Sequence, residues 1–172
     1  METINSFHTD RLVATRLDET DLSELCRMHR DANVMATLGG PRSDERTREF
    51  LRTNLNHWDD HGFGLWMFRD ASKRTFVGRG GLRHVRIGGQ DEVELAYALM
   101  PELWGCGLAT EMARALSRIG FEQLALADLV AFTITTNQAS RRVMEKVGFT
   151  FERELVHAGL PHVLYRLTRT AE

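Results

Sequence analysis

The sequence predicts a mixed α/β fold, in a single domain of residues 1–172, with a mostly antiparallel sheet of six or seven strands flanked by about four helices. Three observations lead to this prediction. Helices and then short strands with turn residues between them occupy the first part of the chain, and helix and strand patterns alternate after about residue 100. No repeat, low-complexity segment or linker divides the chain, and its length is that of one domain.

The first helix follows a strand expected around residues 11–17. Thr20 or Asp21 is placed to cap the helix, because a short polar side chain can accept from its free N–H groups. Apolar residues then recur every three positions, which puts them on one helix face; they are Leu22, Leu25 and Met28. The break at 39–41, Gly-Gly-Pro, ends this helical region.

A second helix is predicted to start at Ser43. Its hydroxyl and the two acidic residues that follow match the free N–H groups and positive dipole end of a helix. The helix stops at Gly62 or Gly64. Its apolar residues are Phe50, Leu51, Leu55 and Trp58.

The middle of the chain has the pattern of antiparallel strands. Residues 65–69 and 75–82, joined by a polar turn at 70–74, predict a hairpin. The glycines in its second strand, at 78, 80 and 81, predict a bulge or a very close backbone neighbour. The next turn is Gly88-Gly89, which leads into a strand at 93–100.

The last part alternates helix and strand and closes with a hairpin. The expected elements are a helix at 107–123, a strand at 129–135, a helix at 137–147 ended by Gly148, and strands at 149–155 and 162–168. A β-α-β-α-β segment therefore follows the antiparallel part.

Composition excludes several classes of function. The net charge of −2, from 22 basic and 24 acidic residues, gives no electrostatic reason for a nucleic-acid or membrane-surface partner. No apolar run is long enough to span a bilayer. The two cysteines, Cys26 and Cys106, are expected to be free thiols in a reducing cytoplasm.

The stretch most informative about function is 93–111, where a strand runs into a glycine-containing loop that opens directly into a helix. Such a junction presents backbone N–H groups at the positive end of a helix dipole, and glycine lets an anion approach the backbone. A phosphate or pyrophosphate is the expected ligand. An ordinary strand-to-helix turn is the alternative.

Two other phosphate-binding motifs fit poorly. The loop lacks the Lys-Ser/Thr pair of a nucleoside-triphosphate P-loop. Thr110 stands where a dinucleotide fingerprint has its third glycine, and an antiparallel half precedes the motif where a parallel sheet should begin.

The sequence resembles the GNAT acetyltransferases, and within them the ribosomal-protein N-terminal acetyltransferases. The resemblance covers nearly the whole chain and rests on five segments: Thr9-Asp10-Arg11-Leu12, Phe76-Val77-Gly78, Glu94-Leu95-Ala96-Tyr97, Pro101-Glu102-Leu103-Trp104-Gly105-Cys106-Gly107-Leu108-Ala109-Thr110-Glu111 and Asn137-Gln138-Ala139-Ser140-Arg141-Arg142-Val143-Met144-Glu145-Lys146-Val147-Gly148-Phe149. It implies a GNAT-type sheet and transfer of an acetyl group from acetyl-CoA to a primary amine, either a protein N-terminus or a small molecule.

The resemblance also implies the acetyl-CoA contacts. The loop N–H groups would hold the CoA pyrophosphate, the strand edge would pair with the pantetheine arm, and two residues of the later helix would lie beside that arm and its thioester. These residues are Ala98, Leu99, Met100, Trp104, Gly105, Cys106, Gly107, Leu108, Ala109, Thr110, Asn137 and Ser140. Relatives often have Lys or Arg at Cys106, so Arg141 or Arg142 is a candidate to supply the missing charge.

Catalysis is expected to occur by direct attack of the amine in a ternary complex. Glu94 is the candidate general base, acting through water, or else a salt-bridged or solvated strand residue. Many GNAT enzymes place a tyrosine where this chain has Met144, which leaves Ser140 as candidate acid for the CoA thiolate, or simply as a helix first-turn hydroxyl.

The remaining expectations concern the acceptor and the alternatives. Phe63, Trp66 and Tyr97 are candidate walls of the acceptor pocket. His57 and His61 share a helix face but lack a third ligand, so no metal site is expected. A homodimer is compatible with the resemblance. The alternative function is a CoA-binding sensor or regulatory module without turnover.

Overall fold

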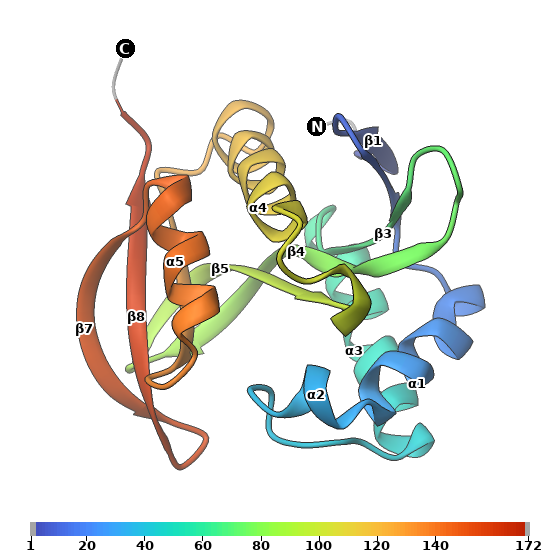
Figure 1. Ribbon diagram of the computed structural model, residues 1–172. Coiled ribbons are helices and arrows are strands. Elements are labelled where there is room, and N and C mark those ends of the chain that lie inside the picture. Colours follow the sequence, from blue (N-terminus) through green and yellow to red (C-terminus); the bar gives the residue numbers. More distant parts are fainter. Residues whose placement is uncertain (1–2, 171–172) are drawn as a thin grey trace. The chain divides into compact units, whose positions relative to one another are not determined.

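The computed structural model describes residues 3–170, and the chain divides into two compact units. Within the described residues, the first unit consists of residues 3–81 and 97–108, and the second of residues 82–96 and 109–170. Figure 1 shows the elements along the chain. None of the helices within residues 3–170 is both long and apolar enough to cross a bilayer.

Within the described residues there are eight strands and five α-helices, in a mixed fold. The strands are β1 (Ser6–His8), β2 (Leu12–Arg16), β3 (Leu65–Asp70), β4 (Phe76–Ile87), β5 (Gln90–Leu99), β6 (Asp128–Ile134), β7 (Thr150–His157) and β8 (Leu160–Thr168). The helices are α1 (Leu22–Arg30), α2 (Ala32–Met35), α3 (Asp44–His61), α4 (Leu108–Arg118) and α5 (Gln138–Val147). The sheet order is β1-β2-β3-β4-β5-β6-β8-β7, and β5 pairs with β6 in parallel.

The core of the first unit contains two tryptophans, one from α3 and one from β3. The rings of Trp58 and Trp66 meet edge to face at 4.9 Å between centroids. Their indole N–H groups donate to backbone oxygens of Leu65 at 2.8 Å and Ile4 at 3.0 Å. Because the buried polar atoms of both rings have partners, the aromatic area is buried without an unsatisfied donor.

Helix α3 begins at a side-chain cap and ends at a glycine, as the sequence predicts. The Ser43 hydroxyl accepts from the N–H of Arg46, and Gly62 ends α3 in the left-handed region at φ 74°. The cap near α1 differs from the prediction. Asp18 and Asp21 form a reciprocal capping box around the 3₁₀ turn Glu19–Asp21, so Asp21 satisfies the turn rather than capping α1.

The glycines of β4 are explained by close backbone neighbours. A Cβ on Gly78 would lie 2.1 Å from the carbonyl oxygen of Ala98, and a Cβ on Gly81 would lie 2.1 Å from that of Gly64. No side chain fits at such distances. The predicted irregularity is also present, as a register shift in the β3–β4 pairing at Phe68.

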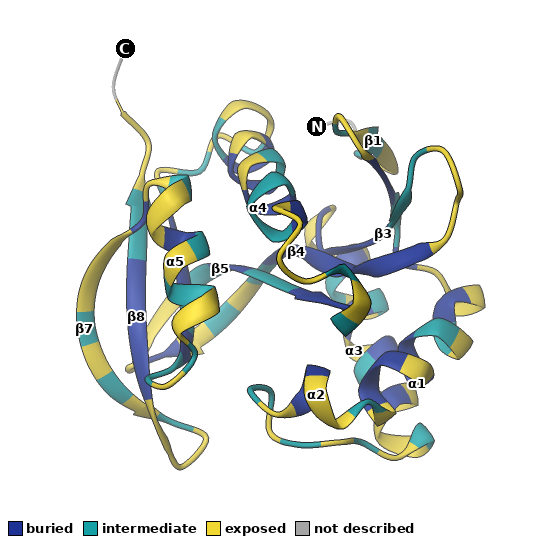
Figure 2. Cartoon of the chain, in the orientation of Figure 1, coloured by how far each residue is buried: buried dark blue, intermediate teal, exposed yellow. Residues whose placement is uncertain are grey.

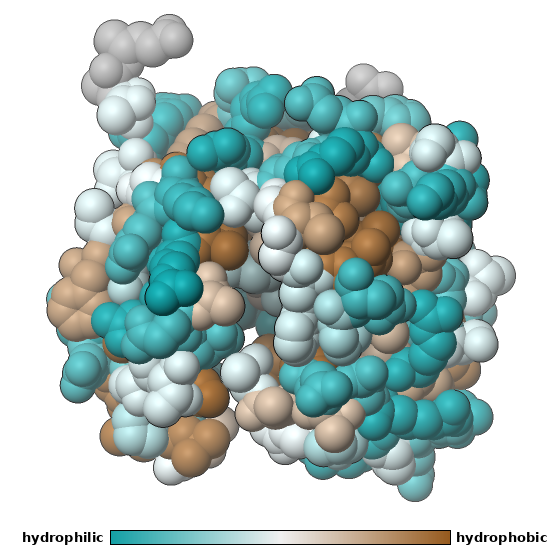
Figure 3. All heavy atoms as spheres, viewed as in Figure 1, coloured by the Kyte–Doolittle hydropathy of each residue, from teal (hydrophilic) through white to brown (hydrophobic). Residues whose placement is uncertain are grey.

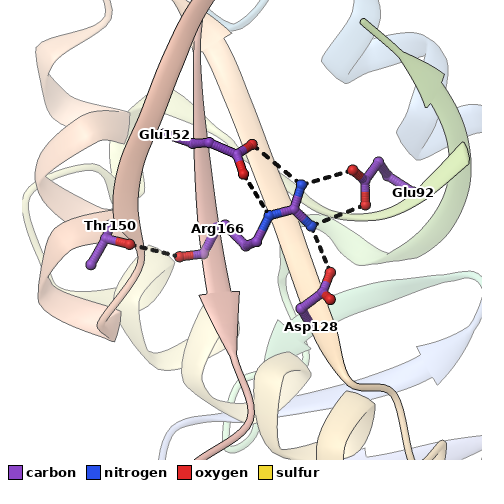
Figure 4. A network of polar contacts seen from close by, with 5 residues as sticks. All are labelled: Glu92, Asp128, Thr150, Glu152 and Arg166. Carbon is purple, nitrogen blue, oxygen red and sulfur yellow. Dashed lines mark hydrogen bonds and ion pairs between the residues drawn. The ribbon is translucent and has the colours of Figure 1, made fainter. Parts of the chain in front are cut away.

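In the second unit β8 lies between β6 and β7, and Figure 2 shows the contrast between β8, whose central residues are buried, and the more exposed β7. An ion-pair network joins four strands of this unit around Arg166 of β8 (Figure 4). Its guanidinium contacts Glu92 of β5 and Asp128 of β6 at 2.7 Å each, and Glu152 of β7 at 2.9 Å.

Several boundaries differ from the prediction. The sheet gains β1, a three-residue strand that precedes the expected first one. Strands β4 and β5 run to Ile87 and from Gln90, closer to the Gly88-Gly89 turn than expected. Helix α4 ends at Arg118, and a π-helical turn, Ile119–Gln123, completes the segment that was expected to be one helix.

Figure 3 shows hydrophilic residues over much of the drawn face, with smaller hydrophobic patches.

Candidate functional site

The predicted cofactor loop begins where β5 ends, in the first unit. A 3₁₀ turn, Pro101–Leu103, follows Met100, with N–H groups of Leu103 and Trp104 donating to the oxygens of Met100 at 3.0 Å and Pro101 at 3.1 Å. Proline suits the first position of such a turn because its φ is already fixed near the required value. It has no N–H, but an N–H at this position would have no partner within the turn. The chain thus turns sharply away from the strand.

The two loop glycines adopt the conformation that the motif requires. Gly105 and Gly107 have φ values of 74° and 80°, in the left-handed region that other residues rarely adopt. A Cβ on Gly105 would meet no atom within 4 Å, so the space above its backbone is open. Helix α4 starts at Leu108, immediately after the second glycine. Its first N–H groups have no acceptor inside the helix.

Two side chains hold this loop in place. The indole N–H of Trp104 donates to the oxygen of Leu99 at 3.0 Å, although 52% of the residue is exposed. Arg11, which directly precedes β2, reaches the loop from far away in the sequence: its Nη1 donates to the oxygen of Cys106 at 2.8 Å. A Cβ on Gly107 would lie 3.5 Å from its Nη2. The guanidinium therefore lies against the glycine-containing turn.

The end of β5, predicted to pair with the pantetheine arm, is buried. Ala98, Leu99 and Met100 are 7%, 5% and 5% exposed. The N–H of Met100 donates to the oxygen of Val77 at 2.9 Å, and the backbone of Gly78 lies against Ala98 and Leu99. Contacts with β4 thus fix the backbone of this segment from one side.

Glu94, the candidate base, belongs to the second unit. Its carboxylate is buried, with 6% of the residue exposed, and Oε2 accepts from Nη2 of Arg83 at 3.0 Å. The salt-bridged alternative raised by the sequence is therefore present. An ion pair orients the carboxylate and does not by itself exclude a role as base, so that role stays a prediction.

Asn137 and Ser140 come together at the start of α5, also in the second unit. The Asn137 side chain caps the helix: Oδ1 accepts from the N–H of Ser140 at 3.2 Å, and Nδ2 donates to Oγ1 of Thr133 at 2.9 Å. Met144, at the position of the missing tyrosine, is 3% exposed and packs in the core. A role of Asn137 and Ser140 toward a cofactor stays a prediction.

The arginines suggested as phosphate partners lie on α5. Arg141 donates to the Tyr165 hydroxyl and to the oxygen of Thr135, both at 3.2 Å. Its hydrogen bond to Tyr165 raises the pKa of the guanidinium. Arg142 is exposed. Arg11, to which the sequence analysis gave no role toward the phosphates, contacts the loop of the first unit.

The three acceptor-pocket candidates differ in how far they are buried. Trp66 is fully buried, packed against Trp58 and Phe7, so it is a core residue, which corrects the prediction that it walls a pocket. Phe63 is 8% exposed and Tyr97 is half-buried, and their role stays a prediction. Among residues 3–170 no three His, Cys, Asp or Glu side chains are grouped as metal ligands. Cys26 is buried and Cys106 exposed, both as free thiols.

The candidate residues are thus divided between the two units. The first unit brings together the end of β5, the loop from Trp104 to Leu108 and Arg11. The second contains Glu94, Ala109, Thr110, Asn137 and Ser140. The first set contains backbone N–H groups and the guanidinium of Arg11, and the second contains a carboxylate, an amide and a hydroxyl.

Comparison with known proteins gives a consistent result. Residues 11–150 match the model of a protein family described as acetyltransferase (GNAT) domain. The Bacillus subtilis protein YkkB is 28% identical over 158 residues, covering 91% of this chain and 92% of its own. The FsC-acetyl coenzyme A-N(2)-transacetylase of Aspergillus fumigatus is 30% identical over 154 residues, covering 84% of this chain and 65% of its own. A crystal structure of an acetyltransferase from Agrobacterium tumefaciens superposes with a TM-score of 0.85 at 25% identity, covering 98% of this chain and 97% of the other.

Proposed function

The chain belongs to the GNAT acetyltransferase family and is an acyltransferase, and from this premise we propose that it transfers the acetyl group of acetyl-CoA to a primary amine. The observation that carries the proposal is the junction of strand, glycine loop and helix at 98–110. It lies inside the segment matched by the family model. That model spans both units, which supports treating residues 1–172 as one acetyltransferase domain.

The loop is suited to the pyrophosphate of acetyl-CoA. The left-handed glycines and the start of α4 can present several N–H groups to one anion, and a Cβ-free surface at Gly105 leaves room for it. We assign Gly105 to Thr110 to the pyrophosphate and the backbone of 98–100 to the pantetheine arm. The name of the Aspergillus fumigatus relative, a transacetylase of acetyl coenzyme A, supports this choice of co-substrate.

In the proposed reaction the amine nitrogen attacks the thioester carbonyl carbon, a C–N bond forms, and the C–S bond breaks as CoA leaves. An amine arrives as ammonium, so a base must first take its proton; Glu94 is proposed to do so through water. N–H groups near Leu99 would polarise the carbonyl. Ser140 is the proposed proton donor to the thiolate, and it regains a proton from the attacking nitrogen, which loses its second proton as the amide forms.

The acceptor is proposed to be a primary amine of a protein N-terminus or of a small molecule. Resemblance to the ribosomal-protein acetyltransferases favours the first, and the N(2)-transacetylase relative supports an amine nitrogen in general. A homodimer in the cytoplasm completes the proposal.

A CoA-binding module without turnover is the second candidate. Two observations favour it: Met144 is buried where many GNAT enzymes have a tyrosine, and the Asn137 side chain is engaged in capping α5. The candidates differ in one measurable property, which is whether acetyl-CoA is consumed.

Thermal unfolding with acetyl-CoA tests the co-substrate, with NADPH and ATP in parallel. A ligand at about 100 times its Kd stabilises the folded state by about 2.7 kcal/mol. This corresponds to a Tm rise of roughly 5–10 °C for a protein of this size. We expect the rise with acetyl-CoA alone. A rise only with NADPH or ATP would show that the loop binds another ligand.

The variant Glu94→Gln separates enzyme from sensor. In the enzyme, kcat for an amine found by screening should fall by about 10² or more, the usual contribution of a general base, while acetyl-CoA affinity persists. Unchanged kcat would remove Glu94 from the mechanism. Acetyl-CoA binding without release of CoA for any amine would favour the sensor.

A further inference from the structure

We propose that Arg11 binds the phosphate groups of acetyl-CoA and supplies the positive charge that the cofactor loop lacks. The inference rests on the proposed function, because it assigns Arg11 to the same co-substrate. It adds a residue from the opposite end of the first unit's sequence, 95 positions from the loop residue that it contacts.

The charge of the loop is the first argument. The segment from Pro101 to Glu111 contains two glutamates, Glu102 and Glu111, and neither lysine nor arginine. A pyrophosphate carries two negative charges, and acetyl-CoA has a further phosphate on its ribose. Backbone N–H groups contribute only partial charges, so a full positive charge nearby would add substantially to binding.

The second argument is geometric. Nη1 of Arg11 donates to the oxygen of Cys106 at 2.8 Å, and Nη2 lies 3.5 Å from the position of a Cβ on Gly107. A guanidinium has five N–H donors in a planar fork. One such group can therefore hold a loop carbonyl and also face an anion bound over the same glycine turn. Arg11 is exposed, so a ligand in solvent can reach it.

The position of the contact also explains how the charge is kept at the loop. The bond to Cys106 ties the guanidinium to the residue between the two left-handed glycines. An arginine so anchored loses less rotamer freedom on binding an anion than a free surface side chain does. The arginine and the loop therefore form one prearranged surface.

The experiment compares Kd values for two ligands in the intact protein. Acetyl-CoA carries the phosphates, whereas S-acetylpantetheine has the same thioester arm without any phosphate. Titration calorimetry at low and high salt is run on the wild type, Arg11→Gln and Arg11→Lys. Arg52→Gln, which removes one exposed charge from α3 of the same unit, is the matched control.

We expect Arg11→Gln to weaken acetyl-CoA about tenfold, which equals about 1.4 kcal/mol, and to reduce the salt dependence of its Kd. S-acetylpantetheine should bind Arg11→Gln and wild type alike. Arg11→Lys, which keeps the charge, should retain the salt dependence, and Arg52→Gln should behave as wild type.

Two results would overturn the assignment. One is an Arg11→Gln protein with wild-type affinity and salt dependence for acetyl-CoA. The other is equal weakening of both ligands with unchanged salt dependence, which means that Arg11 only shapes the loop. Failure of the wild type itself to bind acetyl-CoA would be a different outcome, since it would reject the proposed function and the role of Arg11 together.

Discussion

His29 of α1 is a fully buried histidine held in its neutral form. Its Nδ1 lies 3.1 Å from Oγ1 of Thr47, and Nε of Arg79 donates to its Nε2 at 3.2 Å. Because arginine has no acceptor, Nε2 must be the unprotonated nitrogen, and Nδ1–H therefore donates to Thr47. Burial, with the nearby charges of Arg79 and Arg42, lowers the pKa of His29 to about 3.

This histidine predicts a loss of stability in weak acid. In the unfolded chain His29 takes up a proton near pH 6.5, the ordinary pKa of a histidine, whereas in the folded chain it does so only at about pH 3. The contribution of His29 to the free energy of unfolding is therefore complete above pH 6.5 and is lost as the pH falls below that value. The slope is at most about 1.4 kcal/mol per pH unit, and it is smaller to the extent that solvent screens the charge. Urea unfolding at a series of pH values measures this slope.

The control is His29→Gln, which has no proton to gain. Its free energy of unfolding should be lower than that of wild type near neutral pH, and it should decline less between about pH 6.5 and pH 4.5. Identical slopes in the two proteins would mean that His29 does not contribute to the acid sensitivity.

Residues could be predicted from sequence when the requirement was local. The loop glycines are an example, since Gly105 and Gly107 adopt positive φ in the chain segment that carries the motif. Arg11 could not be predicted, because only the folded first unit brings it to Cys106. The same holds for Trp66, whose aromatic character suits a pocket wall as well as the core position that it occupies.

Among the elements, α5 begins at a side chain with a clear structural role and a proposed role toward the cofactor. Asn137 caps the helix through Oδ1 and holds Thr133 of β6 through Nδ2. Replacing the cap with alanine should lower the free energy of unfolding by about 1 kcal/mol. We expect Asn137→Ala to show this loss in urea unfolding.

Asn137→Ser then separates the two roles. Serine is also a good cap, so this variant should recover most of the lost stability. It lacks the amide, however, and if Asn137 lies beside the pantetheine arm its affinity for acetyl-CoA should still fall. Wild-type affinity in Asn137→Ser would define the residue as a cap only.

Helix ends were predictable because caps are encoded locally, as at Ser43, Gly62 and Gly148. Strand ends were less so, because they depend on a partner strand. The three residues of β1 form a strand through pairing with β2, with Ser6 opposite Thr15, and their own sequence gives little signal. The end of α4 was also missed, since a π-helical turn at Ile119 leaves the apolar pattern of a helix intact.

At the scale of the whole molecule, the fold class followed from the order of elements, but the strand order did not. The pattern of residues 149–168 does not predict that β8 lies between β6 and β7. The charges that stabilise this arrangement are far apart in sequence. Glu92 and Arg166, which meet at 2.7 Å, are 74 positions apart. A net charge of −2 reveals none of this pairing.

Among the residues drawn in Figure 4, Arg166 is the only cation, and removing its charge should lower the free energy of unfolding. Arg166→Gln would leave Glu92, Asp128 and Glu152 together without their shared partner. Arg166 and Glu92 have side chains only 22% and 12% exposed, whereas Asp128 and Glu152, at 37% and 35%, are partly screened by solvent. We therefore expect a loss of about 2 kcal/mol in the free energy of unfolding at neutral pH.

The pH dependence of that loss identifies its cause. The hydrogen bond from Arg166 lowers the pKa of Glu152, so in the wild type this carboxylate contributes stability above its ordinary value of 4.5 that is lost as the pH falls. In Arg166→Gln acid instead removes the repulsion between the neighbouring carboxylates. The difference in free energy of unfolding between the two proteins should therefore narrow between about pH 7 and pH 4.

Arg86→Gln, which breaks the exposed pair with Asp91, is the control and should change stability little at either pH. A gap that stays constant with pH would mean that Arg166 stabilises the four strands by packing of its side chain rather than by charge.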